Sequence, residues 1–232
     1  TPGPHDISAF PLYTNLEDGD FHLQGVSRGI DEGDPAVLVL TDIDGDIRPT
    51  NSASDIGADE YNGCLIKVGS TLFGVLQTAI DYAESEGYDT IRIARGECSG
   101  AEERAGTWQM GYISQDLTLI GSLRRTDFSD PDDYHNHNVG TNSTILNARG
   151  EGRVLRIAAG ANVTIRHLVL INGDAGAAND ATANGGGIYK AGAGSVTFEE
   201  SLVCANVGEN GGGYYAGSSS DTLLSGGSTG AC

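Results

Sequence analysis

The chain has few basic residues and no long apolar run. Thirteen lysine and arginine residues stand against thirty-two acidic ones, which gives a formal net charge of -19. A polyanion without a basic cluster is repelled by phosphate backbones and by anionic lipids, so the composition argues against a nucleic-acid partner. No stretch approaches the roughly eighteen uninterrupted apolar residues of a membrane span, so we expect no membrane insertion.

The sequence also lacks CxxC pairs and the combined cysteine and histidine patterns of zinc sites, and it does not begin with methionine. A chain that begins at Thr1 fits a protein whose export signal has been removed. We therefore expect an extracellular or cell-surface location. In such a compartment the tripeptides that begin at Asn142 and Asn162 would permit N-glycosylation.

Four cysteines are present, at Cys64, Cys98, Cys204 and Cys232. They allow three pairings, and free thiols are a further alternative. The pairing Cys64–Cys98 with Cys204–Cys232 is the most economical, because it closes one loop at each end of the second part of the chain. We predict these two disulfides.

An internal repeat indicates the architecture. "NGGGIYKAGAGSVTFEE" begins at Asn184 and "NGGGYYAGSSSDTLLSG" begins 26 residues later, at Asn210. A period of this length is typical of a solenoid. Short strands rich in β-branched residues precede the repeat and are separated by Gly, Asn and Asp: "TIRIARG", "LTLIGS", "STILNA", "RVLRIAAG" and "NVTIRHLVLING". These patterns predict an all-β fold, a right-handed parallel β-helix over residues 63–232.

One helix is predicted within "STLFGVLQTAIDYAESEG". Leu72, Leu76, Ile80 and Ala83 share one helical face, Ser70 or Thr71 is a candidate N-cap, and Gly87 ends the pattern. An amphipathic helix at this place would cover the apolar end of the first coil.

These residues resemble a known family. "CLIKVGSTLFGVLQTAIDYAESEGYDTIRIARGECSG" and the following "LTLIGSLRRTDFSDP" are similar to the opening coils of bacterial parallel β-helix proteins of the pectin-lyase-like superfamily, and the similarity covers roughly Cys64 to Gly227. Separately, "DFHLQGVSRGIDEGD" followed by "TDIDGDIRPTNSASDIGADEY" resembles the segment that completes the last coil in surface-anchored β-helix proteins. In that family the closing segment follows the coils, whereas here it precedes them.

Because the closing segment precedes the coils, we predict that residues 1–62 form an extended segment that closes the open end of a β-helix, here called the donor segment. It could fold back on its own coils, cap the open end of a second copy, or mark one unit of a tandem array. We favour donation to a second copy, because no closing phrase follows the last Gly-rich coil, which would present an open strand edge. Repeated head-to-tail donation would build a homopolymer, and the chain would be the subunit of an extracellular filament or surface appendage. The side chains expected to contact the acceptor are Phe10, Leu12, Phe21, Leu23 and Ile30.

Two other functions remain open, a monomeric adhesin-like module and a secreted polysaccharide lyase or hydrolase. The resemblance implies the enzyme, since the superfamily includes such activities. Its densest candidate stretch, "DFSDPDDYHNHN", spans residues 127–138 and is also typical of an acidic surface loop. No catalytic constellation converges in sequence, so no catalytic residue is named. Tyr189, Tyr214 and Tyr215 occupy equivalent repeat positions and suit either an aromatic stack or a carbohydrate platform.

A structural cation is the remaining prediction. Asp42, Asp44 and Asp46 place carboxylates at alternate positions around Gly45, like the first half of a calcium loop, and Asp55 could complete the site. Ala53 stands where an EF-hand has its final glutamate, so no EF-hand is present. The alternative is a turn in which the aspartates bond to their own backbone.

Overall fold

The computed structural model describes residues 7–16, 20–23, 27–30, 32–34, 36, 39–43, 48–49, 53–61, 63–123, 128, 143–217 and 222–229. These residues are mostly in β-strands, with one α-helix, so the all-β class is confirmed. The strands are β1 (Tyr13–Asn15), β2 (Asp20–Leu23), β3 (Ile66–Val68), β4 (Thr71–Phe73), β5 (Thr90–Ala94), β6 (Gly96–Ser99), β7 (Glu102–Arg104), β8 (Thr107–Ile113), β9 (Leu117–Leu123), β10 (Thr144–Asn147), β11 (Arg153–Ile157), β12 (Asn162–Arg166), β13 (Leu168–Ile171), β14 (Ile188–Lys190), β15 (Ser195–Cys204), β16 (Tyr214–Ala216) and β17 (Thr222–Thr229), and the helix is α1 (Leu76–Glu86).

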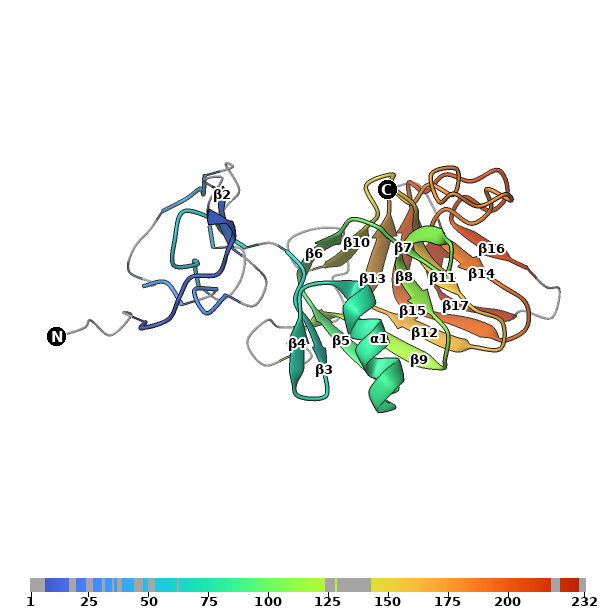
Figure 1. Cartoon of the computed structure of the whole chain (residues 1–232), viewed down its shortest axis with the longest axis horizontal. Coiled ribbons are helices and arrows are strands. Elements are labelled where there is room, and N and C mark those ends of the chain that lie inside the picture. Colours follow the sequence, from blue (N-terminus) through green and yellow to red (C-terminus); the bar gives the residue numbers. More distant parts are fainter. Residues whose placement is uncertain are drawn as a thin grey trace.

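Parallel strands stack in three columns (Figure 1). The first column is β5, β9, β12 and the first halves of β15 and β17. The second is β6, β10, β13 and the second halves of β15 and β17. The third is β8, β11, β14 and β16, which forms a separate sheet. The chain contributes one strand to each of the three columns in the same order, and we call each such round of three strands a passage. Each passage therefore stacks on the one before it.

The internal repeat coincides with this stacking. Asn184 and Asn210 form a parallel bridge, and Ile188 pairs with Tyr214 in the third column. Both pairs are 26 residues apart, as the repeat predicts. Glycines permit the close approach of the two copies, since a Cβ on Gly187 would overlap the carbonyl oxygen of Gly213.

The core consists of apolar side chains that repeat along each column. Ile91, Leu119 and Ile165 occupy paired positions in the first column, and all three are fully buried. Leu155 and Ile188 do the same in the third column. Burying each large apolar side chain contributes about 1.5–3 kcal/mol, so these rows supply most of the stability of the stack.

Antiparallel strands and the helix cover one end of the stack. β3 and β4 form a hairpin that pairs antiparallel with β5, and β7 pairs antiparallel with β8. The helix begins at Leu76, so the predicted start at Ser70 or Thr71 was wrong. Leu72 belongs instead to β4, because Thr71–Phe73 pairs with β3, and its side chain is exposed. Gly87 ends the helix in the left-handed conformation, as predicted.

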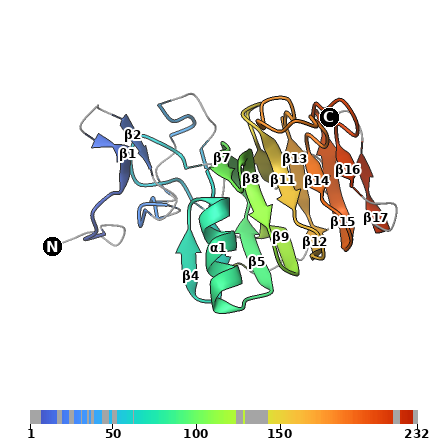
Figure 2. The same ribbon diagram turned by 45° about the vertical axis from the view of Figure 1, so that its right-hand side comes forward.

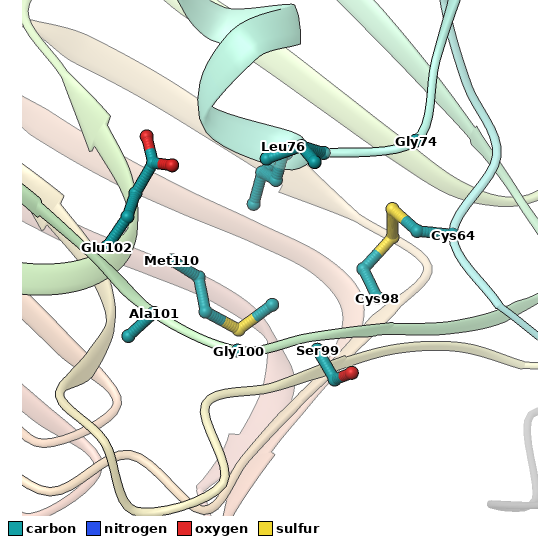
Figure 3. Close-up of a pocket in the computed structure, with 10 residues that line it drawn as sticks. Cys64, Gly74, Leu76, Cys98, Ser99, Gly100, Ala101, Glu102 and Met110 are labelled. Atoms are coloured by element: carbon teal, nitrogen blue, oxygen red, sulfur yellow. A yellow bond between two sulfur atoms is a disulfide. The ribbon is translucent and has the colours of Figure 1, made fainter. Parts of the chain in front are cut away.

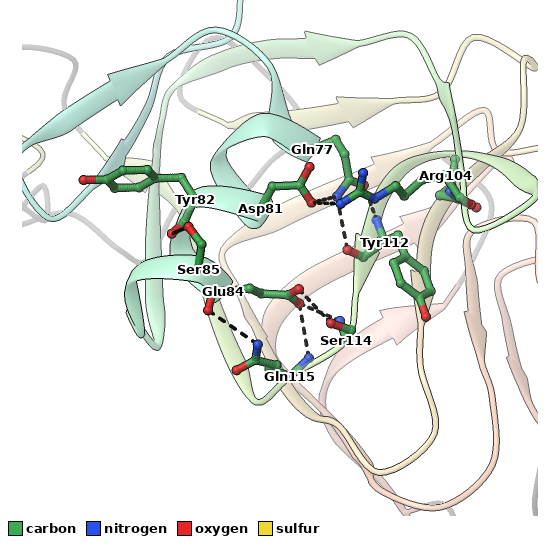
Figure 4. Close-up of polar contacts among 10 residues, drawn as sticks. Gln77, Asp81, Tyr82, Glu84, Ser85, Arg104, Tyr112, Ser114 and Gln115 are labelled. Atoms are coloured by element: carbon green, nitrogen blue, oxygen red, sulfur yellow. Dashed lines mark hydrogen bonds and ion pairs between the residues drawn. The ribbon is translucent and has the colours of Figure 1, made fainter.

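The helix is fastened to β8 and the turn after it by polar contacts (Figure 4). The Glu84 carboxylate accepts hydrogen bonds from the backbone N–H groups of Ser114 and Gln115, at 2.6 and 3.2 Å. Gln77, which is buried, accepts one from the backbone N–H of Tyr112 at 2.6 Å. Leu76 and Ile80 pack into the core on the apolar face. The sequence predicts this apolar face, but it does not predict the hydrogen bonds that Glu84 and Gln77 accept from the backbone.

The two ends of the stack differ. Figures 1 and 2 show residues 7–61 beside the end that carries β3 and β4, while β16 and β17 lie at the far end. Among the described residues, β16 pairs only with β14, and β17 only with β15. The segment therefore does not cover the far end of its own stack.

Glycine packing between passages generates a stability prediction. Replacing Gly186 by Ala places a methyl group against the carbonyl oxygen of Val207, so we expect a loss of about 1–3 kcal/mol in the free energy of unfolding. Gly74→Ala is the matched control, because its nearest neighbour would be 3.9 Å away. Chemical denaturation measures both variants. Equal stabilities would contradict the close stacking.

Candidate functional site

The N-terminal segment, residues 7–61 as described, is organised around buried polar groups. Arg48, Asp55, Asp59 and Glu60 are all at most 7% exposed. The Arg48 guanidinium donates from Nε to the Glu60 carboxylate at 3.0 Å, and its other nitrogens donate to the carbonyl oxygens of Asp55 and Gly57. A buried charge needs such a partner, because desolvation of an unpaired ion is expensive. Arg48 therefore holds the turn 55–60 around itself.

The acidic residues of the segment bond to backbone N–H groups. The Glu60 carboxylate also accepts from the N–H of Asp55, and the Asp55 carboxylate accepts from the N–H of Tyr61. Asp59 accepts from the N–H of Leu23 at 2.7 Å, which joins β2 to this turn. The "DIGADEY" phrase is thus a folding motif in which Asp55 and Glu60 accept hydrogen bonds from backbone groups of the phrase itself, and Asp59 accepts one from β2.

The predicted calcium ligands fall partly within this network. Asp42 accepts a hydrogen bond from the N–H of Glu60 at 3.1 Å, while Asp44 and Asp46 lie outside the described residues. Within the described ranges, no group of three or more histidine, cysteine, aspartate or glutamate side chains is placed to hold a metal ion. Calcium stays a prediction for the full loop.

The outer surface of the segment is apolar. Among the described residues, thirteen large hydrophobic side chains are exposed, and eight of them belong to this short segment: Ile7, Phe10, Leu12, Leu16, Phe21, Val39, Leu40 and Ile43. Phe10 and Leu40 are the most exposed, at 78% and 71%. Of the contact residues predicted from sequence, Phe10, Leu12 and Phe21 are exposed, Ile30 is half-buried, and Leu23 is already buried within its own chain.

This arrangement is unusual for a folded unit. Four charged side chains are buried while eight large apolar side chains face outward. An exposed apolar surface is costly in water and commonly marks an interaction site. The sequence indicates which apolar residues are available. It does not indicate that buried charges would leave them outside.

The tyrosines of the repeat form a stack. Tyr189 and Tyr215 pair in register, with ring centroids 5.5 Å apart and planes within 10° of parallel. Arg153 lies 4.9 Å from the Tyr189 ring centroid. Tyr214 instead packs edge-on against Phe198 in the core. Because the rings of Tyr189 and Tyr215 cover each other's faces, the geometry favours the stack over a flat carbohydrate platform.

Two buried cationic side chains bind carbonyl oxygens in the turns of the stack. Arg153 is fully buried, donates from Nε to the carbonyl oxygen of Asn184 at 2.9 Å, and lies 3.0 Å from the Asp180 carboxylate. Lys190, also fully buried, donates to several carbonyl oxygens of the turn that follows it, including Ala193 at 2.6 Å. Sequence reasoning missed both residues, since an isolated Arg or Lys in a strand carries no signal of burial.

The Arg153–Asp180 pair shifts the ionisation of both groups. Burial lowers the pKa of Arg153, against the opposing charge of Asp180. Burial alone would raise the pKa of Asp180, but hydrogen bonds from Thr182 and the charge of Arg153 together hold it below its ordinary value of 3.8. The pair fastens the long loop between β13 and β14 to β11.

The structure contains a disulfide between Cys64 and Cys98. It lies in the wall of a cavity of about 140 Å³ that Leu76, Glu102 and Met110 also line (Figure 3). Cys204 is disulfide-bonded as well. Cys232 lies outside the described residues, so the pairing Cys204–Cys232 stays a prediction.

The remaining candidate residues divide by position. Asn162 begins β12 with an exposed side chain whose Nδ2 donates to Asp116, so a glycan there would displace this hydrogen bond. Asn142 lies outside the described residues, as does all of the acidic stretch 127–138 except Phe128.

Comparisons with protein-family models, with curated proteins and with solved structures find no match for the chain. In the described part of the chain, no helix is both long enough and apolar enough to cross a membrane.

The buried centre of the segment generates a local stability prediction. Arg48→Met leaves the Glu60 carboxylate buried without its cation, so we expect the segment to lose about 3–5 kcal/mol of local stability. Hydrogen exchange and limited proteolysis should then show faster opening of residues 53–61, with unchanged protection in β9 and β12. Arg28→Met, at an exposed position, is the control and should behave as the parent chain. Equal protection in both variants would contradict the role of Arg48.

The depressed pKa of Asp180 predicts a pH-dependent effect. A carboxyl group whose pKa is lower in the folded chain stabilises it above the unfolded pKa, and this contribution is lost as the pH falls through the folded value. Asp180→Asn should therefore cost about 2–3 kcal/mol near pH 7, and the difference from the parent should vanish well below pH 4. Asp89→Asn, at an exposed turn, should change stability by less than about 0.5 kcal/mol. Denaturation at several pH values tests this, and a pH-independent cost would refute the assignment.

Proposed function

We propose that residues 63–232 form a single-stranded right-handed parallel β-helix and that the chain is a structural subunit of an extracellular filament or surface appendage. Copies assemble head to tail, when the N-terminal segment of one packs on the β16–β17 end of the next. Three columns of parallel strands, visited in a fixed order, support the β-helix. The observation that carries the assembly is the apolar outer surface of a segment whose interior is charged.

The segment is suited to docking because its conformation is held by its own contacts. Arg48 and the carboxylates around it fix the turn 55–60 without using the exposed apolar side chains. Binding then costs less conformational entropy than ordering a free peptide would. Phe10, Phe21 and Leu40 stay available for the acceptor.

The acceptor end has the matching properties. β16 and β17 each have one neighbour among the described strands, and an open strand edge can pair with an added strand. The rows of apolar side chains along the first and third columns run toward this end. A donated segment would extend these rows and remove its own apolar side chains from water.

The difference between the two ends gives the assembly its direction. The β3–β4 hairpin, β7 and helix α1 cover the other end, so two acceptor ends or two donor ends do not match each other. A contact between unlike surfaces repeats indefinitely unless the rotation closes a ring. A polar, unbranched filament is the expected product. The formed disulfide is compatible with the extracellular location that we propose.

Substitution of an exposed leucine tests the donor surface. Leu40→Glu puts a charge where we expect an apolar contact, so association should weaken by at least about tenfold, since each buried leucine contributes about 1.5–3 kcal/mol. Leu72→Glu is the matched control, because Leu72 is also exposed but lies on β4, outside the segment. Light scattering over a concentration series measures assembly. Equal assembly by both variants, or a parent chain that is monomeric at every concentration, would refute the proposal and favour a monomeric module.

A further inference from the structure

The Cys64–Cys98 disulfide lies where the N-terminal segment joins the stack. Cys64 follows the segment within a few residues, and Cys98 is in β6, the first strand of the second column. The Tyr61 hydroxyl donates to the carbonyl oxygen of Cys64 at 2.6 Å, so the last turn of the segment is tied directly to the disulfide. This bond therefore restricts the direction in which the segment leaves the stack.

The disulfide is buried, yet small molecules can approach it. Cys64 is 7% exposed and Cys98 is 2% exposed. Both line the cavity of about 140 Å³, in which the disulfide faces Leu76 and Met110 (Figure 3). A cavity of this size admits a thiol of a few heavy atoms and excludes the active site of a folded oxidoreductase.

Glu102 gives the cavity a charge. It is an exposed residue at the cavity wall, on β7, and the chain as a whole carries a net charge of -19. The attacking species in disulfide exchange is a thiolate, and a further negative charge on the same molecule would be repelled. A positive charge would be attracted. The cavity thus favours neutral or cationic thiols.

We propose that the Cys64–Cys98 disulfide is an exchange site for small neutral or cationic thiols and that its opening uncouples the N-terminal segment from the stack. A thiolate attacks the sulfur of Cys64, the more exposed residue of the pair, forms a mixed disulfide with it and releases the Cys98 thiolate, which takes up a proton. A second thiol attacks the added sulfur and releases Cys64. In total, two small thiols are oxidised to one small disulfide, and the protein disulfide is reduced to two thiols.

The consequence for assembly rests on the proposed function. In the oxidised chain the segment leaves the stack in one restricted direction, so its apolar surface is presented as a rigid extension. In the reduced chain the same surface is attached by a freer link, and docking then requires more conformational entropy to be lost. The disulfide thereby regulates the same donor contact without forming part of it.

Three thiols of similar size and different charge test the exchange site on the full-length chain: 2-mercaptoethylamine, 2-mercaptoethanol and 2-mercaptoethanesulfonate, compared at equal thiolate concentration. Peptide mapping after alkylation follows Cys64 and Cys98 separately from Cys204. We expect reduction rates to fall in that order, by several-fold overall. Glu102→Gln should narrow the range of rates, and Ala101→Leu, which enlarges a side chain in the cavity wall, should slow all three reactions at least about tenfold. Glu103→Gln is the control, because Glu103 is an exposed residue of β7 that does not line the cavity, and this variant should keep the parent order. Reduction rates that depend neither on the charge of the thiol nor on the Ala101→Leu substitution would overturn the proposed exchange site.

The coupling to assembly is measured on the same samples. Reduction should lower the extent of assembly at least about tenfold while the far-ultraviolet circular dichroism of the strands is unchanged. Loss of the strand signal on reduction, or reduced chains that assemble as well as oxidised ones, would overturn the coupling and leave the proposed function standing. Oxidised chains that do not assemble would instead refute the proposed function, whatever the thiol rates.

Discussion

Parallel pairing between successive passages of the chain is the constraint on which the structure depends. Each inner strand of the three columns forms backbone hydrogen bonds with the strand of the preceding passage and with the strand of the following passage, so rows of Ile, Leu and Val align in the core. Such a stack has no internal reason to stop, because every added passage creates a new edge like the last. How each end is covered therefore decides whether the chain acts alone or in an assembly.

The two ends are treated differently, and the difference is chemical as well as geometric. One end has antiparallel strands and an amphipathic helix, which cannot continue a parallel column. The other has β16 and β17, which can. The N-terminal segment places buried charge at its centre around Arg48 and apolar side chains on its surface, and in Figures 1 and 2 it lies away from the end that could use them. This combination is what the filament proposal explains.

Much of the fold follows from local sequence signals. β-branched strands, Gly-rich turns and the repeat of 26 residues predict the strand positions and the pairing of Asn184 with Asn210. The helix start was misjudged, because the apolar period that includes Leu72 competes with strand pairing, and tertiary contacts with β3 decide it. Arg153 and Lys190 were missed, because their burial depends on carbonyl oxygens brought together by the fold.

The segment shows a second limit of sequence reasoning. Its motif is legible in "DIGADEY", yet the natural interpretation of alternating aspartates is a cation site. Of the predicted ligands, Asp42 and Asp55 accept hydrogen bonds from backbone N–H groups, while Asp44 and Asp46 lie outside the described residues. The guanidinium of Arg48 is the cation beside Glu60. The residue types alone do not distinguish a cation site from a network of hydrogen bonds with the backbone, since carboxylate oxygens serve in both.

Electron microscopy of the purified, oxidised chain tests the central claim most directly. Negative-stain images should show unbranched, polar filaments whose axial repeat equals the stacked length of one copy, and removal of residues 1–63 should abolish them while leaving a folded stack. Single compact particles at every concentration, or filaments that persist without the segment, would contradict the account.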